Sequence, residues 1–386
     1  MKVLYGMSSN GQGHINRSRI FIKQLIKDGH EVHILLAGKR PPQYAFEIVP
    51  KTLYVPGPTD IYKDNKVDYG TSLHYNFANL NHWLEYRKEL VEPISKESYD
   101  LFISDLEHNV CYIGKQLNKP VICINRQHAI FHPLSVHAPG RAFDKMGCRL
   151  VYAIMQPYYT HSYSIDFTNK IQTLEKDTLF PLIWKPELDK YKIAIEDHIT
   201  AYLPWYDADK LVNKFSQFPD EIFYVYGFNK KKKVKNVVFK ETSRDGFLTD
   251  LVSSKGVIGN AGFNICWEVS LLKKFIWSMP LWGQYEQITN AYRLEQLGQA
   301  FVSQDFTTEY IAKFLAWIEI EDYIPKNNIT VMQPSDLLNH VYNWLENYNR
   351  EYVPDRRKIR RDIKLSLNRW RMRHEIRKEI KANHFG

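Results

Sequence analysis

Three polar side chains in the first third of the chain stand just after short apolar segments that we expect to be strands. His14 follows a glycine-rich segment, and Asp105 and Glu107 follow the apolar run Leu101–Ile103. The carboxyl ends of parallel strands meet at one edge of a sheet, so these side chains can lie together. A histidine there can act as a general base, and either carboxylate can orient it or replace it. His128 ends another apolar run and is a second candidate base; a structural role stays open for both histidines.

The segment Gly11–His14 reads Gly-Gln-Gly-His and opens a predicted helix. Glycine lets a backbone approach a ligand closely, and the amino end of a helix favours negative charge. Gly13 is therefore a candidate contact for a phosphorylated ligand. A dinucleotide fingerprint needs a further glycine at position 16, where this chain has Asn16, so the pattern argues against NAD. A tight turn with a structural histidine is the alternative.

A second glycine-rich turn follows the predicted strand 256–258 and precedes another predicted helix. A strand, a glycine turn and the amino end of a helix are suited to bind a diphosphate. The candidate contacts are Asn260, Ala261, Gly262 and Phe263. Glu268 lies further along this helix, where its carboxylate can accept hydrogen bonds from two ribose hydroxyls.

The next predicted strand, 275–278, is followed by a polar segment that would open a helix at the same edge of the sheet. Gln284, Glu286 and Gln287 lie in this segment. Carboxylate and amide groups there suit the hydroxyls of a sugar. The alternative is that Glu268 and Glu286 are solvated helix residues.

Strands and helices alternate along the chain, which predicts an α/β fold with parallel sheets. Helices are expected at 15–27, 107–115, 142–158 and 335–349. Strands are expected at 3–5, 32–37, 101–103, 120–124, 162–167, 199–203, 222–226, 236–239, 256–258 and 275–278. A connection at 181–191 divides the chain into parts at 1–190, 191–334 and 335–386.

The chain has 386 residues, of which 44% are apolar and 25% charged, as in ordinary globular proteins. No apolar run approaches the roughly 18 residues that span a bilayer, and the N-terminus does not resemble a signal peptide. The four cysteines lack zinc-ligand spacing, which favours buried thiols in a reducing compartment. We therefore expect a cytoplasmic protein. Asp207 and Asp209 form a D-x-D pattern, but Asp207 is better interpreted as a helix cap, so no metal site is predicted.

The positive charge is concentrated at the C-terminus. Residues 350–386 contain 13 Lys and Arg against five Asp and Glu, a net charge of +8 out of +9 for the whole chain. Such a segment can bind an anionic membrane surface, for example at the inner face of the membrane, or a nucleic acid. A closing helix whose charges are only solvated is the alternative.

Four motifs in this order resemble the GT-B glycosyltransferases, in particular the branch of MurG, diacylglycerol galactosyltransferase and the UDP-glucuronosyltransferase-type enzymes. They are G-x-G-H-x-x-R-S at 11–18, I-S-D-x-E at 103–107, N-R-Q-H at 125–128 and G-N-A-G-F…E…P-L-x-G-Q-x-E-Q-x-x-N-A at 259–291. The resemblance covers about residues 1–318. It implies two Rossmann-like domains whose parallel sheets face each other across a cleft, with 1–190 on the acceptor side and 191–334 binding a nucleotide-sugar. The helices in 335–386 would pack back on the N-terminal domain.

The resemblance also implies roles for individual residues. Gly262 and its neighbours match the diphosphate loop, and Glu268 matches the ribose-binding glutamate. Glu286 and Gln287 match the pair that contacts the donor sugar. His14 matches a histidine that is either a base or a contact of the donor phosphate. Such enzymes usually invert the anomeric centre and use neither a metal nor a cofactor, and a UDP-sugar is the favoured donor.

One residue departs from the family pattern, and two other functions stay open. Trp267 is bulky where the family favours small or polar residues before the glutamate, which can alter nucleotide preference. A sugar-nucleotide 2-epimerase has the same fold and would need no acceptor. A non-catalytic protein would bind a nucleotide or polyanion without turnover. The acceptor is open between glycolipid, polysaccharide, small molecule and modified DNA base.

Overall fold

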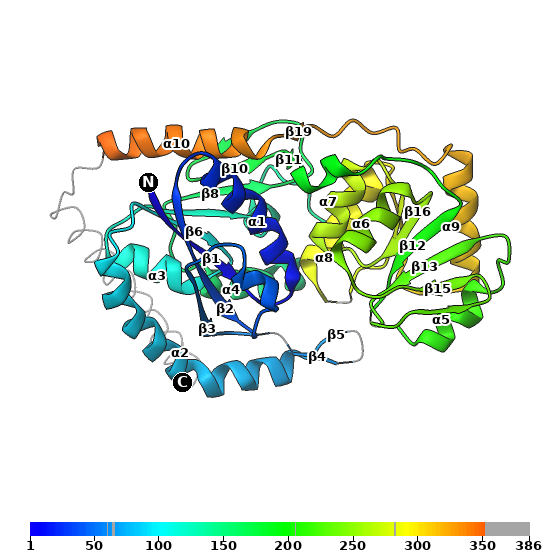
Figure 1. Ribbon diagram of the computed structural model, residues 1–386, viewed down its shortest axis with the longest axis horizontal. Coiled ribbons are helices and arrows are strands. Elements are labelled where there is room, and N and C mark those ends of the chain that lie inside the picture. The colour runs from blue at the N-terminus through cyan, green and yellow to red at the C-terminus, as the bar shows by residue number, and fades with distance from the viewer. Residues whose placement is uncertain (60, 64–65, 205, 282, 352–386) are drawn as a thin grey trace, which may run out of the picture. The chain divides into compact units, whose positions relative to one another are not determined.

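The computed structural model describes residues 1–59, 61–63, 66–204, 206–281 and 283–351 (Figure 1). Met1–Leu338 form one compact unit, and the described residues from Asn339 on belong to a second. The first unit contains two large sheets, each mostly parallel.

The first sheet has eight strands in the order β3-β2-β1-β6-β7-β8-β10-β9. Neighbouring strands pair in parallel, except that β9 runs antiparallel to β10. The strands are β1 (Lys2–Ser8), β2 (Glu31–Gly38), β3 (Thr52–Pro56), β6 (Leu101–Asp105), β7 (Val121–Asn125), β8 (His161–Ile165), β9 (Gln172–Leu174) and β10 (Asp177–Phe180). Because β1, β6 and β7 are neighbours, the residues after them meet at one edge of the sheet.

Helices connect these strands and place side chains at that edge. They are α1 (Gln12–Lys27), α2 (Tyr69–Lys96), α3 (His108–Gln116) and α4 (Ala142–Met155), with the short 3-10 helices η1 (Gln43–Phe46) and η2 (Ala129–Phe131). A small hairpin, β4 (Tyr62–Lys63) with β5 (Lys66–Val67), precedes α2.

The second sheet has seven strands in the order β14-β15-β13-β12-β16-β17-β18. They are β12 (His198–Tyr202), β13 (Ile222–Tyr226), β14 (Lys232–Val234), β15 (Val237–Phe239), β16 (Gly256–Gly259), β17 (Ile276–Ser278) and β18 (Ala300–Val302). Its helices are α5 (Ala208–Phe215), α6 (Arg244–Ser253), α7 (Phe263–Leu271), α8 (Tyr285–Gln296) and α9 (Thr308–Ile320). Because β16 and β17 are neighbours, the turns that open α7 and α8 lie at the same edge.

A short parallel pair, β11 (Leu182–Ile183) with β19 (Val331–Met332), joins the segment between the two sheets to the end of the first unit. The 3-10 helix η3 (Pro186–Lys190) follows β11, and α10 (Pro334–Glu351) closes the described chain.

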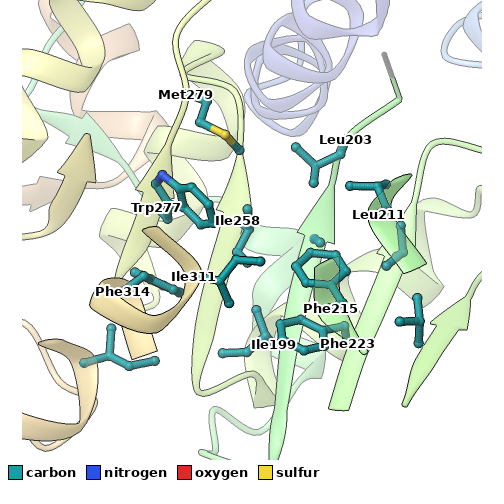
Figure 2. Close-up of a cluster of buried hydrophobic side chains, with 14 of the residues drawn as sticks. Ile199, Leu203, Leu211, Phe215, Phe223, Ile258, Trp277, Met279, Ile311 and Phe314 are labelled. Carbon is teal, nitrogen blue, oxygen red and sulfur yellow. The ribbon is translucent and has the colours of Figure 1, made fainter. Parts of the chain in front are cut away.

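A core of buried side chains holds α5 and α9 against the second sheet (Figure 2). Trp277 on β17 is one of its largest members: the indole is fully buried and stacks on Phe306 with ring centroids 5.4 Å apart. Its Nε1 donates a hydrogen bond to Ser303 Oγ at 2.8 Å, so the polar atom of the indole is satisfied. This core fixes β17, and the polar segment that leads into α8 begins at the end of that strand.

The predicted α/β fold with two mostly parallel sheets is confirmed, and every predicted strand overlaps an observed one. The structure differs from prediction in the segment 40–100, where α2 forms a helix of 28 residues that we did not predict.

The domain boundaries 1–190, 191–334 and 335–386 stay a prediction, as does the packing of residues 335–386 on the N-terminal domain. The basic tail lies outside the described residues from 352 onward. Among the helices that are described, none is long and apolar enough to cross a membrane.

Replacing Trp277 by alanine is expected to lower the free energy of unfolding by about 3–5 kcal/mol, because it leaves a large cavity in the core. Ile320→Ala is the matched control, since the Ile320 side chain is exposed at the end of α9 and its loss should change little. Urea unfolding of both variants measures the difference. Equal stability of the two variants would contradict the assignment of Trp277 to the core.

Candidate active site

A histidine, an arginine and an aspartate form one hydrogen-bonded group between α1 and the end of β6. Gly11 has a φ of 83°, which glycine adopts readily, and α1 begins directly after it. His14 and Arg17 therefore lie one turn apart on the same face of the helix. His14 Nδ1 is 2.9 Å from Asp105 Oδ1, and Arg17 Nε donates to Asp105 Oδ2 at 2.8 Å. Arg17 Nη2 donates to Asp105 Oδ1 at 2.5 Å and also lies 2.9 Å from His14 Nδ1. Ser18 Oγ adds a further hydrogen bond to this carboxylate at 3.1 Å.

The charges in this group keep Asp105 ionised. Burial alone would raise the pKa of Asp105, but the Arg17 guanidinium and the hydrogen-bond contact with His14 lower it below its ordinary value. When His14 donates a proton from Nδ1 to this carboxylate, its Nε2 carries a free lone pair and can accept a proton. Asp105 therefore lies within hydrogen-bond distance of His14, and its role in orienting this histidine stays a prediction.

The structure does not bring Glu107 or His128 into this group. The Glu107 carboxylate caps α3 and accepts from the backbone N–H groups of Asn109 and Val110 at 2.8 and 2.7 Å. Burial raises the pKa of Glu107 to about 7. The His128 ring packs on Tyr159 with centroids 4.5 Å apart, and burial lowers its pKa to about 4. Our expectation that Glu107 orients or replaces His14 is therefore not supported by the position of its carboxylate.

The amino end of α7 is open, as a site for an anion requires. Gly262 precedes the helix, and no side chain caps its first N–H groups. At Gly262 the φ of −60° suits any residue, and an added Cβ would meet no protein atom within 4 Å. Neither backbone conformation nor packing requires glycine here, so this residue leaves space in front of the helix. Asn260 is buried beside it with an Oδ1 that has no hydrogen-bond partner within the described chain.

Arg126, which the sequence analysis did not single out, is a fully buried charge next to this loop. Its Nη1 donates to Asp166 at 2.6 Å, and its Nε donates to Asn290 Oδ1 at 3.2 Å. Asn290 Nδ2 in turn donates to the carbonyl of Ala261 at 3.1 Å. The guanidinium carbon of Arg126 lies 5.4 Å from the ring centre of Phe263, and its buried Nη2 lacks a partner among the described residues.

Arg17 approaches the same ring of Phe263, at 5.9 Å from its centre. A second contact joins the two glycine loops directly, because Asn264 Nδ2 donates to the carbonyl of Gly13 at 3.0 Å. The predicted glycine loops are thus adjacent, and two guanidinium groups lie beside the first residue of α7.

Glu268 is buried within α7 between two cations. Its Oε1 accepts from Lys185 Nζ and from Arg244 Nη2, each at 2.6 Å. Burial would raise the pKa of Glu268, but these two cations outweigh it and lower the pKa to about 2. The alternative that Glu268 is a solvated residue is wrong, since its exposed fraction is 1%.

Glu286 connects the two halves of the site through Gln127. Glu286 Oε2 accepts from Tyr152 OH at 3.0 Å and from Gln127 Nε2 at 3.2 Å. Gln127 Oε1 accepts from Arg17 Nη2 at 3.3 Å. A continuous chain of hydrogen bonds therefore runs from Asp105 through Arg17 and Gln127 to Glu286.

Gln287 and Gln284 hold each other at the start of α8. Gln287 Nε2 donates to Gln284 Oε1 at 2.7 Å, and Gln287 Oε1 accepts from the backbone N–H of Leu281 at 3.0 Å. Their amides thus fix the turn that precedes the helix.

Asp207 caps α5 by accepting from the N–H of Lys210 at 2.9 Å, which confirms the interpretation of the D-x-D segment as a helix start. In the described part of the chain, no group of three or more His, Cys, Asp or Glu could hold a metal ion.

A family model described as glycosyl transferase family 1 matches residues 1–319. The chain belongs to glycosyl transferase family 1. Its matched region contains both glycine loops, Asp105 and the residues around Glu268 and Glu286. The predicted enzyme class is therefore confirmed: the chain is a glycosyltransferase. Curated protein sequences give no match to it.

Solved glycosyltransferase structures are similar to this family member over most of its length. Spinosyn rhamnosyltransferase SpnG, complexed with thymidine diphosphate, is 14% identical with a TM-score of 0.55 and coverage of 89% of this chain and 100% of that chain. Arabidopsis thaliana UGT89C1, complexed with UDP-L-rhamnose, is 12% identical with a TM-score of 0.56 and coverage of 83% and 93%. Acinetobacter baumannii MurG is 12% identical with a TM-score of 0.55 and coverage of 89% and 100%. These similarities confirm the GT-B fold.

Because Glu268 pairs with two cations, we expect that neutralising its carboxylate lowers the free energy of unfolding strongly. The folded-state pKa is lower than that of the unfolded chain, so its contribution to stability is present above about pH 4.5 and is lost as pH falls toward 2. Glu268→Gln should lower the free energy of unfolding at pH 7 by about 3–5 kcal/mol, because buried Lys185 loses its counter-charge. It should also flatten the dependence of stability on pH between about 4.5 and 2.

Urea unfolding at several pH values measures both effects. Glu309→Gln is the matched control, because Glu309 pairs with Lys313 at the exposed surface of α9 and its loss should leave the midpoint in place. Wild-type stability of Glu268→Gln at pH 7 would disprove the ion cluster.

Proposed function

We propose that this glycosyltransferase moves a sugar from a nucleotide-sugar, preferably a UDP-sugar, to an acceptor hydroxyl, with inversion at the anomeric carbon and without a metal. The observation that carries the proposal is the bridge made by Gln127 between Arg17 and Glu286. It puts the candidate base group and a candidate sugar-binding residue in one hydrogen-bond network.

The donor diphosphate is proposed to bind at the amino end of α7. The open helix end and the space at Gly262 suit a negatively charged group. The unpartnered Nη2 of Arg126 and the buried Oδ1 of Asn260 are polar atoms that a bound ligand or an ordered water can satisfy. Arg126 is balanced by Asp166, so it offers a hydrogen-bond donor in a fixed position.

We assign the ribose and the sugar of the donor to the contact residues that the sequence predicted. Both cations bind Oε1 of Glu268, so Oε2 is the oxygen assigned to the ribose hydroxyls. Glu286 and Gln287, with Gln284, are assigned to the hydroxyls of the donor sugar, and Gly13 to the phosphate side. The structure of SpnG contains thymidine diphosphate and that of UGT89C1 contains UDP-L-rhamnose, and both ligands are pyrimidine nucleotides. A pyrimidine diphosphate donor for this chain is in keeping with both.

The proposed reaction step uses His14 as the base. The acceptor oxygen attacks the anomeric carbon from the side opposite the diphosphate, while His14 Nε2 takes the hydroxyl proton. The bond between the anomeric carbon and the diphosphate oxygen breaks, and its electron pair leaves with the diphosphate. The α7 dipole and the Arg126 guanidinium stabilise this developing charge. Asp105 holds the imidazole and stabilises its protonated form.

Two further proposals concern the surroundings of the enzyme. We place it in the cytoplasm, peripherally at the inner face of the membrane, with the basic segment 350–386 as the contact for an anionic membrane or a nucleic acid. The membership in glycosyl transferase family 1 argues against the two other functions that the sequence left open, a sugar-nucleotide 2-epimerase and a non-catalytic binding protein. Product analysis tests the proposed reaction, because only the transferase requires an acceptor.

Donor binding should depend on the space at Gly262. We expect one of UDP, GDP, dTDP and CMP, with UDP favoured, to raise the melting temperature of the protein. Ligand at 100 times its Kd stabilises by about 2.7 kcal/mol. Gly262→Ala should lose most of this shift while its own stability stays within about 1 kcal/mol of wild type, because the Cβ meets ligand and not protein.

Gly147→Ala is the control for this experiment, since Gly147 on α4 also has an empty Cβ position. Shifts that persist in EDTA would support metal independence. If no nucleotide shifts the melting temperature of wild type, the proposed binding of a nucleotide-sugar donor is contradicted. A full shift in Gly262→Ala would place the diphosphate elsewhere.

Transfer should depend on His14 and not on His128. His14→Ala is expected to lower kcat by about 10²–10⁴-fold with the nucleotide-induced melting shift retained, because it removes the base but not the donor contacts. His128→Ala tests the second candidate under the same conditions. Release of the nucleoside diphosphate from the donor, with a panel of hydroxyl acceptors, is the measurement. Near-full turnover of His14→Ala would exclude it as the base.

A further inference from the structure

Arg17 belongs to the group around His14, and the proposed reaction step leaves it without a part of its own. The Arg17 side chain is buried, with 2% of the residue exposed. Its Nε donates to Asp105 Oδ2 at 2.8 Å and its Nη2 donates to Asp105 Oδ1 at 2.5 Å, so the guanidinium engages both oxygens of the carboxylate. A bidentate pair of this kind is a strong hydrogen-bonded ion pair, and it compensates the charge of the aspartate.

One oxygen of Asp105 is shared between Arg17 and His14. Asp105 Oδ1 lies 2.5 Å from Arg17 Nη2 and 2.9 Å from His14 Nδ1, and these two nitrogens are themselves 2.9 Å apart. A guanidinium has donors only, so Arg17 Nη2 cannot take a proton from the imidazole. When His14 Nδ1 carries a proton, two N–H groups therefore converge on one oxygen. Asp105 then stabilises a positive charge on His14 less than it would if Arg17 were absent.

Two further titratable groups face the pair of Arg17 and Asp105, namely Tyr5 on β1 and Glu286 on α8. Tyr5 is fully buried and its pKa is raised well above its ordinary value, first by burial, so Tyr5 is neutral at pH 7. The Glu286 carboxylate reaches Arg17 only through the Gln127 amide, with hydrogen bonds of 3.2 and 3.3 Å. The pair is therefore close to neutral by itself, and a proton on the neighbouring imidazole adds a positive charge that Asp105 does not fully compensate.

We propose that Arg17 holds His14 in the unprotonated form that a base requires. A carboxylate beside an imidazole favours the protonated ring, and a histidine that already carries its second proton cannot accept another from the acceptor hydroxyl. Because Arg17 compensates Asp105, the carboxylate can orient the ring without holding a second proton on it. Arg17 is thus a positioning residue that acts through His14.

The same contact acts again after the transfer. His14 Nε2 takes the proton as the new glycosidic bond forms, and the imidazolium then lies beside the guanidinium of Arg17. Because like charges at this distance repel each other, the ring gives its proton to water once the product has left. This catalytic consequence rests on the proposed function, whereas the protonation of His14 in the free protein does not.

Nuclear magnetic resonance of the full chain with labelled histidine rings, followed as a function of pH, measures the protonation of His14, and His14→Ala assigns its signal. In Arg17→Gln the titration of His14 should move to higher pH by about 1–3 units, because a positive neighbour is removed. Arg17→Lys keeps the charge and should restore most of the wild-type titration. Arg19→Gln is the matched control and should leave the titration in place, since Arg19 lies on α1 but faces away from Arg17.

Asp105→Asn should move the titration of His14 in the opposite direction, because it removes the anion and keeps the cation. If Arg17→Gln does not fold, the double variant Arg17→Gln with Asp105→Asn replaces it, since neither charge is then left buried without its partner. His14 should titrate at higher pH in this double variant than in Asp105→Asn alone. An unchanged titration in Arg17→Gln, or equal titrations in the double variant and Asp105→Asn, would overturn the proposal.

The pH dependence of kcat measures the catalytic consequence. Relative to pH 8, turnover at pH 6 should be lower in Arg17→Gln than in wild type by a further factor of about ten, because more of His14 is already protonated. Normal turnover of His14→Ala, or the absence of a nucleotide-induced melting shift in wild type, would contradict the proposed function. The titration of His14 in the free protein still decides the role of Arg17 in that case, so the two failures are distinguishable.

Discussion

The guanidinium of Arg126 is fully buried at the end of β7, and the candidate site is arranged around it. Arg126 cannot be buried at low cost unless its charge is balanced and its donors are used. Asp166 supplies the charge, and Asn290 supplies an acceptor while it holds the carbonyl of Ala261. The turn before α7 is therefore tied to the first sheet by electrostatics and not by chain connectivity. Phe263 completes the arrangement by covering the guanidinium.

The same physical solution recurs at two buried carboxylates. Asp105 is held between Arg17 and His14, and Glu268 between Lys185 and Arg244. In each case burial opposes ionisation, and the hydrogen-bonded partners of the carboxylate overcome this effect. Oriented charges of this kind need little rearrangement during a reaction in which charge develops, which is the basis of electrostatic preorganisation. The buried polar groups of the site are thus held in fixed positions before a ligand binds.

Much of the fold was predictable because the strands are short apolar runs that end in glycine turns, as at Gly11 and Gly262. The helix α2 was not, because it contains Pro93 and lies largely exposed, so that its apolar residues form no clear stripe. Arg126 and Lys185 were missed since their partners lie 164 and 83 residues away in the chain. Glu107 carried a local signal that was overlooked: a carboxylate directly before a helix commonly caps it.

The cluster at Glu268 also limits how such a site can change during evolution. A substitution of Glu268 alone would leave buried Lys185 uncompensated, and a substitution of Lys185 alone would remove one of the two charges that keep the glutamate ionised. Intermediates with one change are therefore disfavoured by folding, whatever their effect on the donor. Among descendants of this chain, these positions should be inherited or replaced as a group, so that nucleotide recognition drifts more slowly here than at a ligand contact without buried partners.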